Sequence, residues 1–387
     1  MADDDQEIDA EEEEIDPVDE ADETAVPSDP NEEESFPENR FNISSYGWDS
    51  DVEGLVKRLK RQDIHVPRFQ RGFVWTNTQK SRFIESLVMG LPVPNVFLAQ
   101  DGKTRNLNIV DGQQRLLSLR DYLEGKFSLR GEHLQDDLKG RYFSAEVAPS
   151  KRSKVLEIAD ARALSDAVIH SIVIKPDPSD DDPSRGHEYN QAVIQIFRRL
   201  NTSAQPLVAQ EIRTSIFYGS LDSLIRELNQ DENWRTIFGK PHSRLKDMEL
   251  ILRSISLIEN GDNYKAAMPR FLDNYMEANR EMAPDKLQKV RDNFKLVTSA
   301  IVNSIGRDGL RNGTNFILTK LDAVMVGYSE YLKKYSTVDH ADLIKRVGEL
   351  ESDTGDLTSY QWAVSEFVND TDRVLTRVRR ARQIIGA

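Results

Sequence analysis

The stretch NLNIVDGQQRLLSLRDYLEG, residues 106–125, predicts the fold of the amino-terminal half of the chain. Residues 106–110 have the composition of a short strand, and they run directly into Asp111 and Gly112. Leucines then recur at helical spacing up to Gly125. A strand that turns through a glycine into a helix predicts a mixed α+β domain.

Periodicity and turn residues on either side of this stretch predict further elements. Alternating or β-branched runs indicate strands, and apolar residues at helical spacing indicate helices. We expect strands at 64–67, 95–99 and 167–174, the last of them buried, and helices at 51–59, 78–89 and about 151–163. From Glu188 onward every pattern is helical, at 188–200, 212–217, 248–258, 269–277, 287–305, 316–332, 341–350 and 359–381.

Charge is distributed very unevenly along the chain. Residues 1–39 contain 19 Asp or Glu and no Lys or Arg, whereas the rest carries 51 basic and 47 acidic side chains. Such a segment has too few large apolar residues to offset the entropy cost of folding, so we expect a disordered tail over 1–40. The tail is either a solvated segment that aids solubility, or one that covers a basic surface or mimics nucleic-acid charge. The predicted organisation is this tail, an α+β domain over 41–187 and an all-α domain over 188–387.

Composition excludes several classes of site. The chain has no cysteine, which excludes disulfides, thiolate zinc sites and cysteine nucleophiles. Its six histidines are scattered, so no histidine metal site is predicted. No signal sequence and no run of about 18 apolar residues occurs, and we therefore expect a cytoplasmic protein with no membrane partner.

Residues 111–115 combine features that suit a phosphate. A helix amino terminus presents unpaired N–H groups, Gly112 allows close backbone approach, and Arg115 adds a forked cation. Gln113 and Gln114 can hydrogen-bond a sugar or a base. A carboxylate repels phosphate, so Asp111 fits better as a helix cap, a ribose acceptor or a Mg²⁺ ligand. The same five residues could also be an ordinary helix start.

Two further motifs carry cations or amides on predicted loops. Arg68 and Arg71 lie in a segment rich in aromatic residues, 67–75, whose rings either stack on a base or fill the core. Residues 197–201 end a helix at Asn201, a common helix-end residue. Either motif alone predicts only a basic loop.

Taken together, the three motifs are more specific. The run Pro-Arg-Phe-Gln-Arg, the Asp-Gly-Gln-Gln-Arg motif and the later Phe-Arg-Arg-Leu-Asn resemble the amino-terminal domain of GmrSD-type modification-dependent restriction endonucleases. That domain is related to the ParB and sulfiredoxin fold, and in the family the Asp-Gly-Gln-Gln-Arg motif is associated with binding and hydrolysis of a nucleoside triphosphate. The resemblance implies a catalytic set, Asp111, Gln114 and Arg115, with Asp111 as the Mg²⁺ ligand. It also implies a nucleotide-binding set, Arg68, Gln70, Arg71, Gly112, Gln113 and Asn201.

Long members of the family carry an HNH-type nuclease domain that is not expected in this sequence. The first hypothesis is therefore a regulatory protein of a restriction or phage-defence system that binds, or also hydrolyses, a nucleoside triphosphate and acts with a nuclease or effector partner. The second is a ParB-like DNA-binding module without turnover, which would use cations at Arg58, Lys60 and Arg61 or at Arg377, Arg379, Arg380 and Arg382. The third is a stand-alone modification-dependent nuclease with a carboxylate site.

Overall fold

A computed structural model describes most of the chain. The described residues are 43–66, 75–101, 104–148, 154–176, 185–200, 208–313 and 315–387, without the side chains of 185–187. The predicted acidic tail lies outside them, and so do four predicted site residues, Arg68, Gln70, Arg71 and Asn201.

A five-stranded mixed sheet forms the centre of the amino-terminal half, in the order β1-β5-β3-β4-β2. The strands are β1 (Ile43–Asp51), β2 (Ile64–His65), β3 (Val96–Gln100), β4 (Leu107–Asp111) and β5 (Val168–Pro176). Strand β4 is parallel to β2 and antiparallel to β3, while β5 is parallel to β3 and antiparallel to β1. The carboxyl ends of β2 and β4 therefore lie at the same edge as the amino end of β3.

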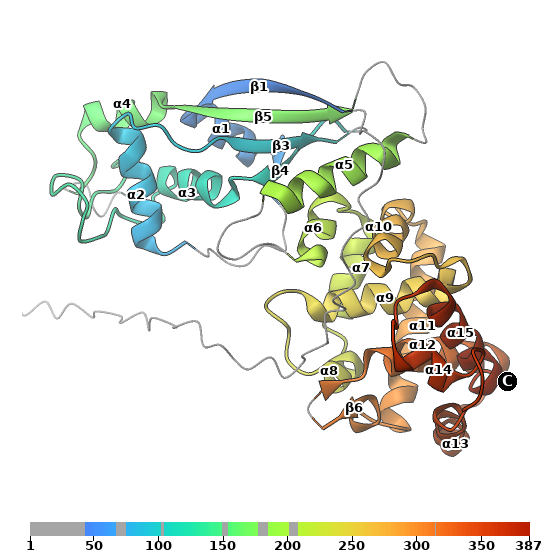
Figure 1. Cartoon of the computed structure of the whole chain (residues 1–387). Coiled ribbons are helices and arrows are strands. Elements are labelled where there is room, and N and C mark those ends of the chain that lie inside the picture. The colour runs from blue at the N-terminus through green and yellow to red at the C-terminus, as the bar shows by residue number, and fades with distance from the viewer. Residues whose placement is uncertain are drawn as a thin grey trace, which may run out of the picture.

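Helices cover both faces of this sheet, so consecutive residues of β3 and β4, which point to opposite faces, are both buried. Leu98 and Ile109 pack into a cluster with α1 (Val52–Lys60), α2 (Asn77–Val88), α3 (Gln113–Leu123) and α4 (Ile158–Asp166). On the opposite face, Ala99, Val110 and Ile174 pack against α5 (Arg185–Leu200) and α6 (Ala209–Ile216). Figure 1 shows α5 and α6 between the sheet and the helices of the carboxyl-terminal half.

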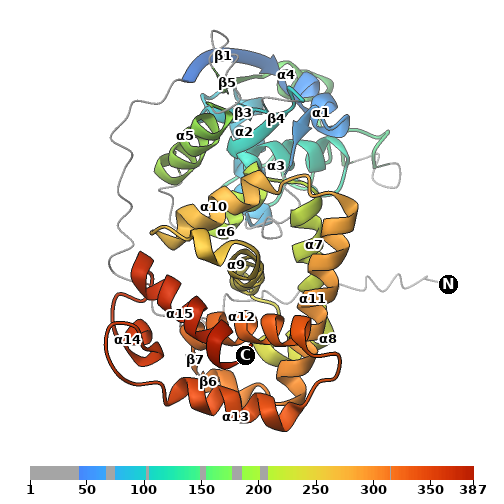
Figure 2. The same cartoon turned by 90° about the vertical axis from the view of Figure 1, so that its right-hand side faces the viewer.

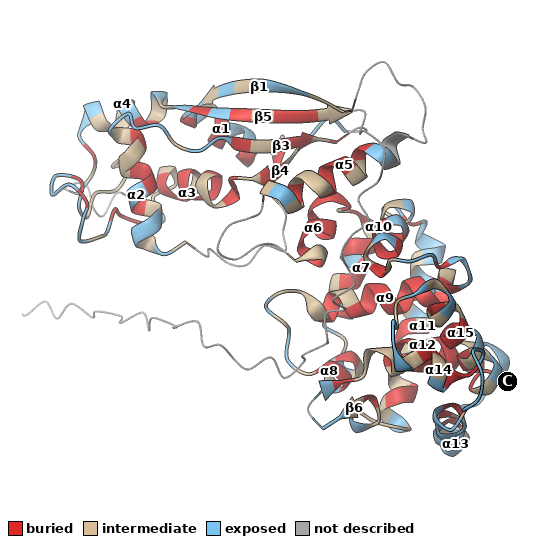
Figure 3. Cartoon of the chain, in the orientation of Figure 1, coloured by how far each residue is buried: buried red, intermediate tan, exposed pale blue. Residues whose placement is uncertain are grey.

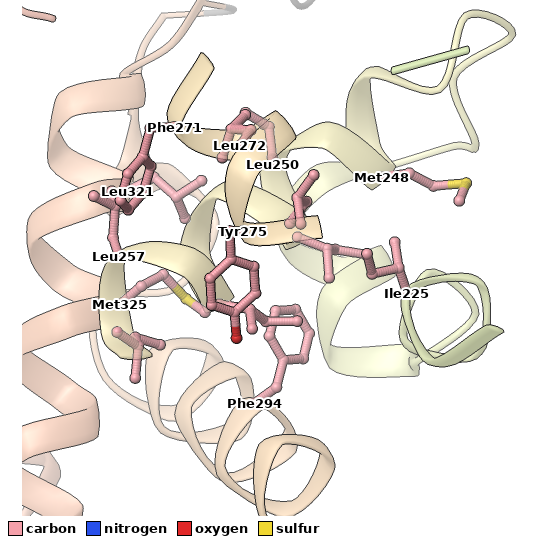
Figure 4. Close-up of a cluster of buried hydrophobic side chains, with 14 of the residues drawn as sticks. Ile225, Met248, Leu250, Leu257, Phe271, Leu272, Tyr275, Phe294, Leu321 and Met325 are labelled. Carbon is pink, nitrogen blue, oxygen red and sulfur yellow. The ribbon is translucent and has the colours of Figure 1, made fainter. Parts of the chain in front are cut away.

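The carboxyl-terminal half is almost wholly helical in its described residues. Its elements are α7 (Ser220–Leu228), α8 (Glu232–Phe238), α9 (Lys246–Asn260), η2 (Gly261–Asn263), α10 (Met268–Ala278), α11 (Pro284–Asn303), η3 (Asp308–Leu310), β6 (Arg311–Asn312), β7 (Asn315–Phe316), α12 (Leu318–Lys334), α13 (His340–Glu351), α14 (Tyr360–Ser365) and α15 (Thr371–Ile384). Helix α9 is buried along nearly its whole length, and its neighbours contribute Tyr275, Phe294 and Met325 to the surrounding apolar cluster (Figures 3 and 4). This cluster is continuous with the core beneath α5 and α6.

The mixed α+β class is confirmed, and so is the strand–turn–helix at 106–123. Several local features differ from the predictions. The helix expected over about 151–163 is α4, which begins only at Ile158. Strand β1 was not predicted, because Ile43-Ser-Ser-Tyr-Gly-Trp shows little apolar alternation and is held by pairing with β5. The helix predicted over 359–381 is two helices, separated at Glu366–Asp370. The strand β5 is only partly buried, with Val168 and His170 exposed. The predicted division at residues 187 and 188 stays a prediction, although α5 packs on the sheet.

None of the helices in the described part of the chain combines the length and the apolar character that a bilayer span requires.

Candidate functional site

Gly112 makes the turn from β4 into α3. It is the N-cap residue of α3 and has a left-handed backbone, with φ 96° and ψ 11°. A Cβ added here would lie 2.9 Å from Cγ2 of Val96, at the start of the neighbouring strand. Both the backbone angle and the close approach require glycine, and together they hold the amino end of α3 against β3.

Asp111 and Arg115 form an ion pair across this turn. One guanidinium nitrogen, Nη2, lies 2.5 Å from Oδ2 of Asp111, and Nη1 donates to the carbonyl of Pro94 at 2.9 Å. The Arg115 side chain is 11% exposed and that of Asp111 44% exposed. One of the three roles expected for Asp111, the helix cap, is therefore wrong: the carboxylate belongs to the last residue of β4 and caps nothing. Among the described residues, two of the five N–H donors of Arg115 therefore make hydrogen bonds within the protein.

The first turn of α3 presents polar groups that the helix itself does not satisfy. The first helical bond is made by the N–H of Leu116, which donates to the carbonyl of Gly112 at 3.0 Å. The N–H groups of Gln113, Gln114 and Arg115 precede it and have no intrahelical acceptor. The Gln113 side chain is buried, with 6% exposure of the residue, and its Oε1 has no hydrogen-bond partner among the described residues. A buried amide oxygen without a donor is costly, so this atom points to a ligand or a water.

Gln114 and strand pairing connect the α3 turn to the segment that carries Arg68, Gln70 and Arg71. The chain enters that segment from β2, where His65 pairs with Asn108 of β4. It leaves the segment at Trp75, whose backbone N–H donates to Oε1 of Gln114 at 3.4 Å. Both ends of the segment are thus fixed beside β4 and α3, although its own residues lie outside the described part of the chain.

The segment that carries Asn201 is similarly fixed at both ends. It joins α5 to α6, and both helices pack on β4. At its downstream end the N–H of Val208 donates to Oε2 of Glu211 at 2.8 Å, and Glu211 is itself 1% exposed. Glu211 was not assigned a role from the sequence, although a Glu in the first turn of a helix is a recognisable capping signal.

A buried ionic cluster joins α6 to the helical half, and sequence reasoning missed it entirely. Arg213 of α6 is 1% exposed and donates to Oδ1 of Asp273 at 2.6 Å and to Oε2 of Glu249 at 2.9 Å. At the sheet itself, Arg280 donates to Oδ2 of Asp101 at 2.8 Å. These partners are 36 to 179 residues apart in sequence, so no local pattern could have indicated them.

A resident metal site built from three or more His, Asp or Glu side chains does not occur in the described residues. The half-exposed carboxylate of Asp111 still fits Mg²⁺, because that ion is commonly held by one or two carboxylates together with substrate phosphates and waters. Asp111 therefore supplies the carboxylate of residues 111–115 that could contact such an ion.

The two basic patches predicted for DNA are largely neutralised. In the first, Lys60 pairs with Glu124 at 3.3 Å, Arg61 pairs with Asp63 at 2.6 Å, and Arg58 lies over the ring of Trp48. In the second, Arg377 is fully buried against Asp322, which also excludes the solvated helix face expected for it. Its neighbours Arg380 and Arg382 pair with Asp353 and Asp262.

Comparison with protein families identifies the amino-terminal half. Residues 52–218 match the family model described as "GmrSD restriction endonuclease, N-terminal domain". Residues 52–218 are a GmrSD-type N-terminal domain. The match begins at α1 and ends just after α6, so it includes strands β2 to β5 of the sheet, the α3 turn and both segments discussed above, but not β1.

The GmrSD-type domain links the chain to restriction systems. Searches of curated proteins and of solved structures found no significant match. The likeness to the ParB and sulfiredoxin fold therefore stays a prediction.

Proposed function

We propose that the GmrSD-type domain binds a Mg²⁺-bound nucleoside triphosphate at the amino end of α3, and that the chain is a nucleotide-dependent regulatory component of a restriction or phage-defence system. The observation that carries the proposal is the first turn of α3. It combines a left-handed Gly112, three N–H groups without intrahelical acceptors and a buried Gln113 oxygen without a donor.

Each residue of the turn has a chemically distinct role in this proposal. The N–H groups and the positive end of the helix dipole bind phosphate oxygens. Gln113 accepts a hydrogen bond from the sugar or base. Arg115 holds Asp111 in place and offers its remaining N–H donors to phosphate, while the free oxygen of Asp111 faces the metal ion. Gln114 ties the Arg68–Arg71 segment to the turn, so that Gln70 and Arg71 can approach the same ligand.

A nucleotide bound here would also contact the helical half indirectly. The Asn201 segment ends at α6, and α6 is joined to α9 and α10 through Arg213, Glu249 and Asp273. This gives nucleotide binding a physical connection to the remainder of the chain, which suits a regulatory role alongside a nuclease or effector partner. The alternative DNA-binding module is less well supported, because most cations of its two predicted patches have acidic partners.

Calorimetric titration of the full-length protein with Mg²⁺ and each common nucleoside triphosphate tests the proposal. We expect one triphosphate to bind, and Arg115→Ala to lose that binding. Arg82→Ala is the matched control, because Arg82 is an exposed arginine of the same domain. Equal affinity in wild type and Arg115→Ala would remove the site assignment. Phosphate release by the same proteins then measures hydrolysis.

A further inference from the structure

A groove of about 620 Å³ lies on the helical half, between the end of α9, helix α10 and the start of α11. Its charged lining residues are three cations, Lys265, Arg270 and Lys286, and one anion, Glu259. Four asparagines complete most of its polar surface, Asn260, Asn263, Asn274 and Asn279. The groove is therefore basic and rich in hydrogen-bonding groups, although the chain as a whole has a net charge of −15.

The cations of this groove differ from those of the two patches predicted for DNA. Within the described ranges, the side chains of Lys265 and Arg270 make no hydrogen bond or ion pair, and the side chain of Lys286 donates only to Oδ1 of Asn279 at 2.8 Å. Both unpaired cations flank the amino end of α10, whose N-cap residue Ala267 offers no capping side chain. A helix amino terminus adds positive potential at the same place. The groove thus attracts an extended anionic ligand.

We propose that the acidic amino-terminal segment of the same chain, residues 1–39, binds this groove. Its 19 carboxylates and complete lack of Lys and Arg complement the groove charge. A chain of about 40 residues can extend to roughly 140 Å, so its length does not restrict it to the sheet.

The position at which the acidic segment joins the described structure also favours its binding to the groove. It enters at Ile43 of β1, which packs on the core cluster that includes α10. Figure 2 shows β1 beginning on the same side of the molecule as α5 and α10. Those two helices are in contact, since Asn190 of α5 donates to Oε1 of Glu277 of α10 at 2.7 Å.

Tethering makes such a contact effective even though exposed ion pairs are individually weak. A ligand on the same chain is present at an effective concentration in the millimolar range. The contact is electrostatic, so it weakens as salt shortens the screening length to about 3 Å at 1 M. The bound segment occludes the groove from other polyanions, which makes it an internal competitor for phosphate-bearing strands.

Distance measurement between two spin labels tests this proposal in the full-length chain. Since the protein has no cysteine, Ala10→Cys beside the Glu11–Glu14 run and Ala283→Cys beside the groove are the only labelled positions. We expect a short-distance population in 50 mM NaCl that is lost in 1 M NaCl and in the Lys265→Glu/Arg270→Glu variant. Lys57→Glu/Arg162→Glu is the matched control, because it reverses one exposed lysine and one exposed arginine on α1 and α4.

Three outcomes overturn the proposal. One is a distribution of distances between the two labels that is the same in 50 mM and 1 M NaCl and in the Lys265→Glu/Arg270→Glu variant. Another is an equal loss in groove and control variants, which would make the contact a general charge effect. The third is an unchanged distance in the groove variant together with lost binding of a 30-nucleotide single-stranded DNA, which assigns the groove to nucleic acid.

Discussion

The α3 turn and the buried ionic clusters of the helical half differ in the partners of their polar side chains. In the helical half, Asp322 is fully buried and accepts from Arg253 at 2.7 Å through each oxygen and from Arg377 at 2.8 Å. At the α3 turn, the buried Gln113 oxygen has no donor in the described part of the chain, and the Asp111 carboxylate is partly exposed. The buried charges of this cluster have counter-charges within the fold, although Nε of Arg377 also has no hydrogen-bond partner among the described residues. The unpartnered Gln113 oxygen differs because it lies at a helix amino terminus, where free N–H groups can bind a ligand beside it.

The largest effect should come from Asp322→Asn. This change leaves Arg253 and Arg377 buried without their counter-charge, and breaking a buried pair costs about 3–5 kcal/mol of unfolding free energy. Urea unfolding measures the loss. The control is Asp262→Asn, where the partner of Arg382 is 73% exposed and the expected cost is below about 1 kcal/mol. Similar small losses in both variants would mean that burial does not distinguish these pairs.

Glu249 should make the unfolding free energy of the protein fall markedly at acidic pH. Burial alone raises its pKa, but Lys246 and Arg213 outweigh burial and lower the pKa from 4.5 to about 2. The folded protein therefore binds this proton more weakly than the unfolded chain. The resulting stabilisation, on the order of 3 kcal/mol, is complete above about pH 5 and is lost as pH falls from about 4.5 to 2.

A comparison of wild type with Glu249→Gln by urea unfolding over pH 3 to 7 checks this sensitivity. The difference in unfolding free energy should be greatest at neutral pH and shrink toward pH 3. Glu259→Gln, an exposed change near the end of the same helix, is the control. A difference that stays constant with pH would contradict the account.

Gly112→Ala should have a smaller effect on stability and a clear one on the α3 turn. A left-handed alanine and its contact with Val96 cost about 1–3 kcal/mol, and relief of the contact shifts the first turn of α3. Gly140→Ala separates the two contributions, since Gly140 has φ +72° and no atom within 4 Å of an added Cβ. We expect reduced triphosphate binding in Gly112→Ala alone. Identical stability and binding in the two variants would show that the close approach to β3 is unimportant.

Local sequence patterns predicted those parts of the fold that local physics determines. The leucine spacing of 116–123 and the strand before Gly112 were readable because each depends on neighbouring residues. Strand β1 was not, because its stability comes from pairing with β5, 117 to 133 residues away. The separation of α14 from α15 was missed because the apolar spacing continues through the break.

The candidate site was predictable as a motif but not as a geometry. The Asp-Gly-Gln-Gln-Arg motif identified the turn, yet it could not show that Asp111 pairs with Arg115 rather than capping α3. The contact of Arg115 with the Pro94 carbonyl depends on a residue 21 positions away, in the loop just before β3. The Gln113 side-chain oxygen lacks a hydrogen-bond donor because of how the surrounding residues pack, and a local sequence pattern does not encode that packing.

The most direct test of the α3 site is Gln113→Leu. Replacing a buried, unpartnered amide by an apolar group of similar size is neutral or stabilising for a residue that only packs. We predict unchanged or higher unfolding free energy together with at least about tenfold weaker triphosphate binding, measured by urea unfolding and calorimetry on the same preparation. Wild-type affinity in Gln113→Leu would contradict the proposal that this turn binds the nucleotide.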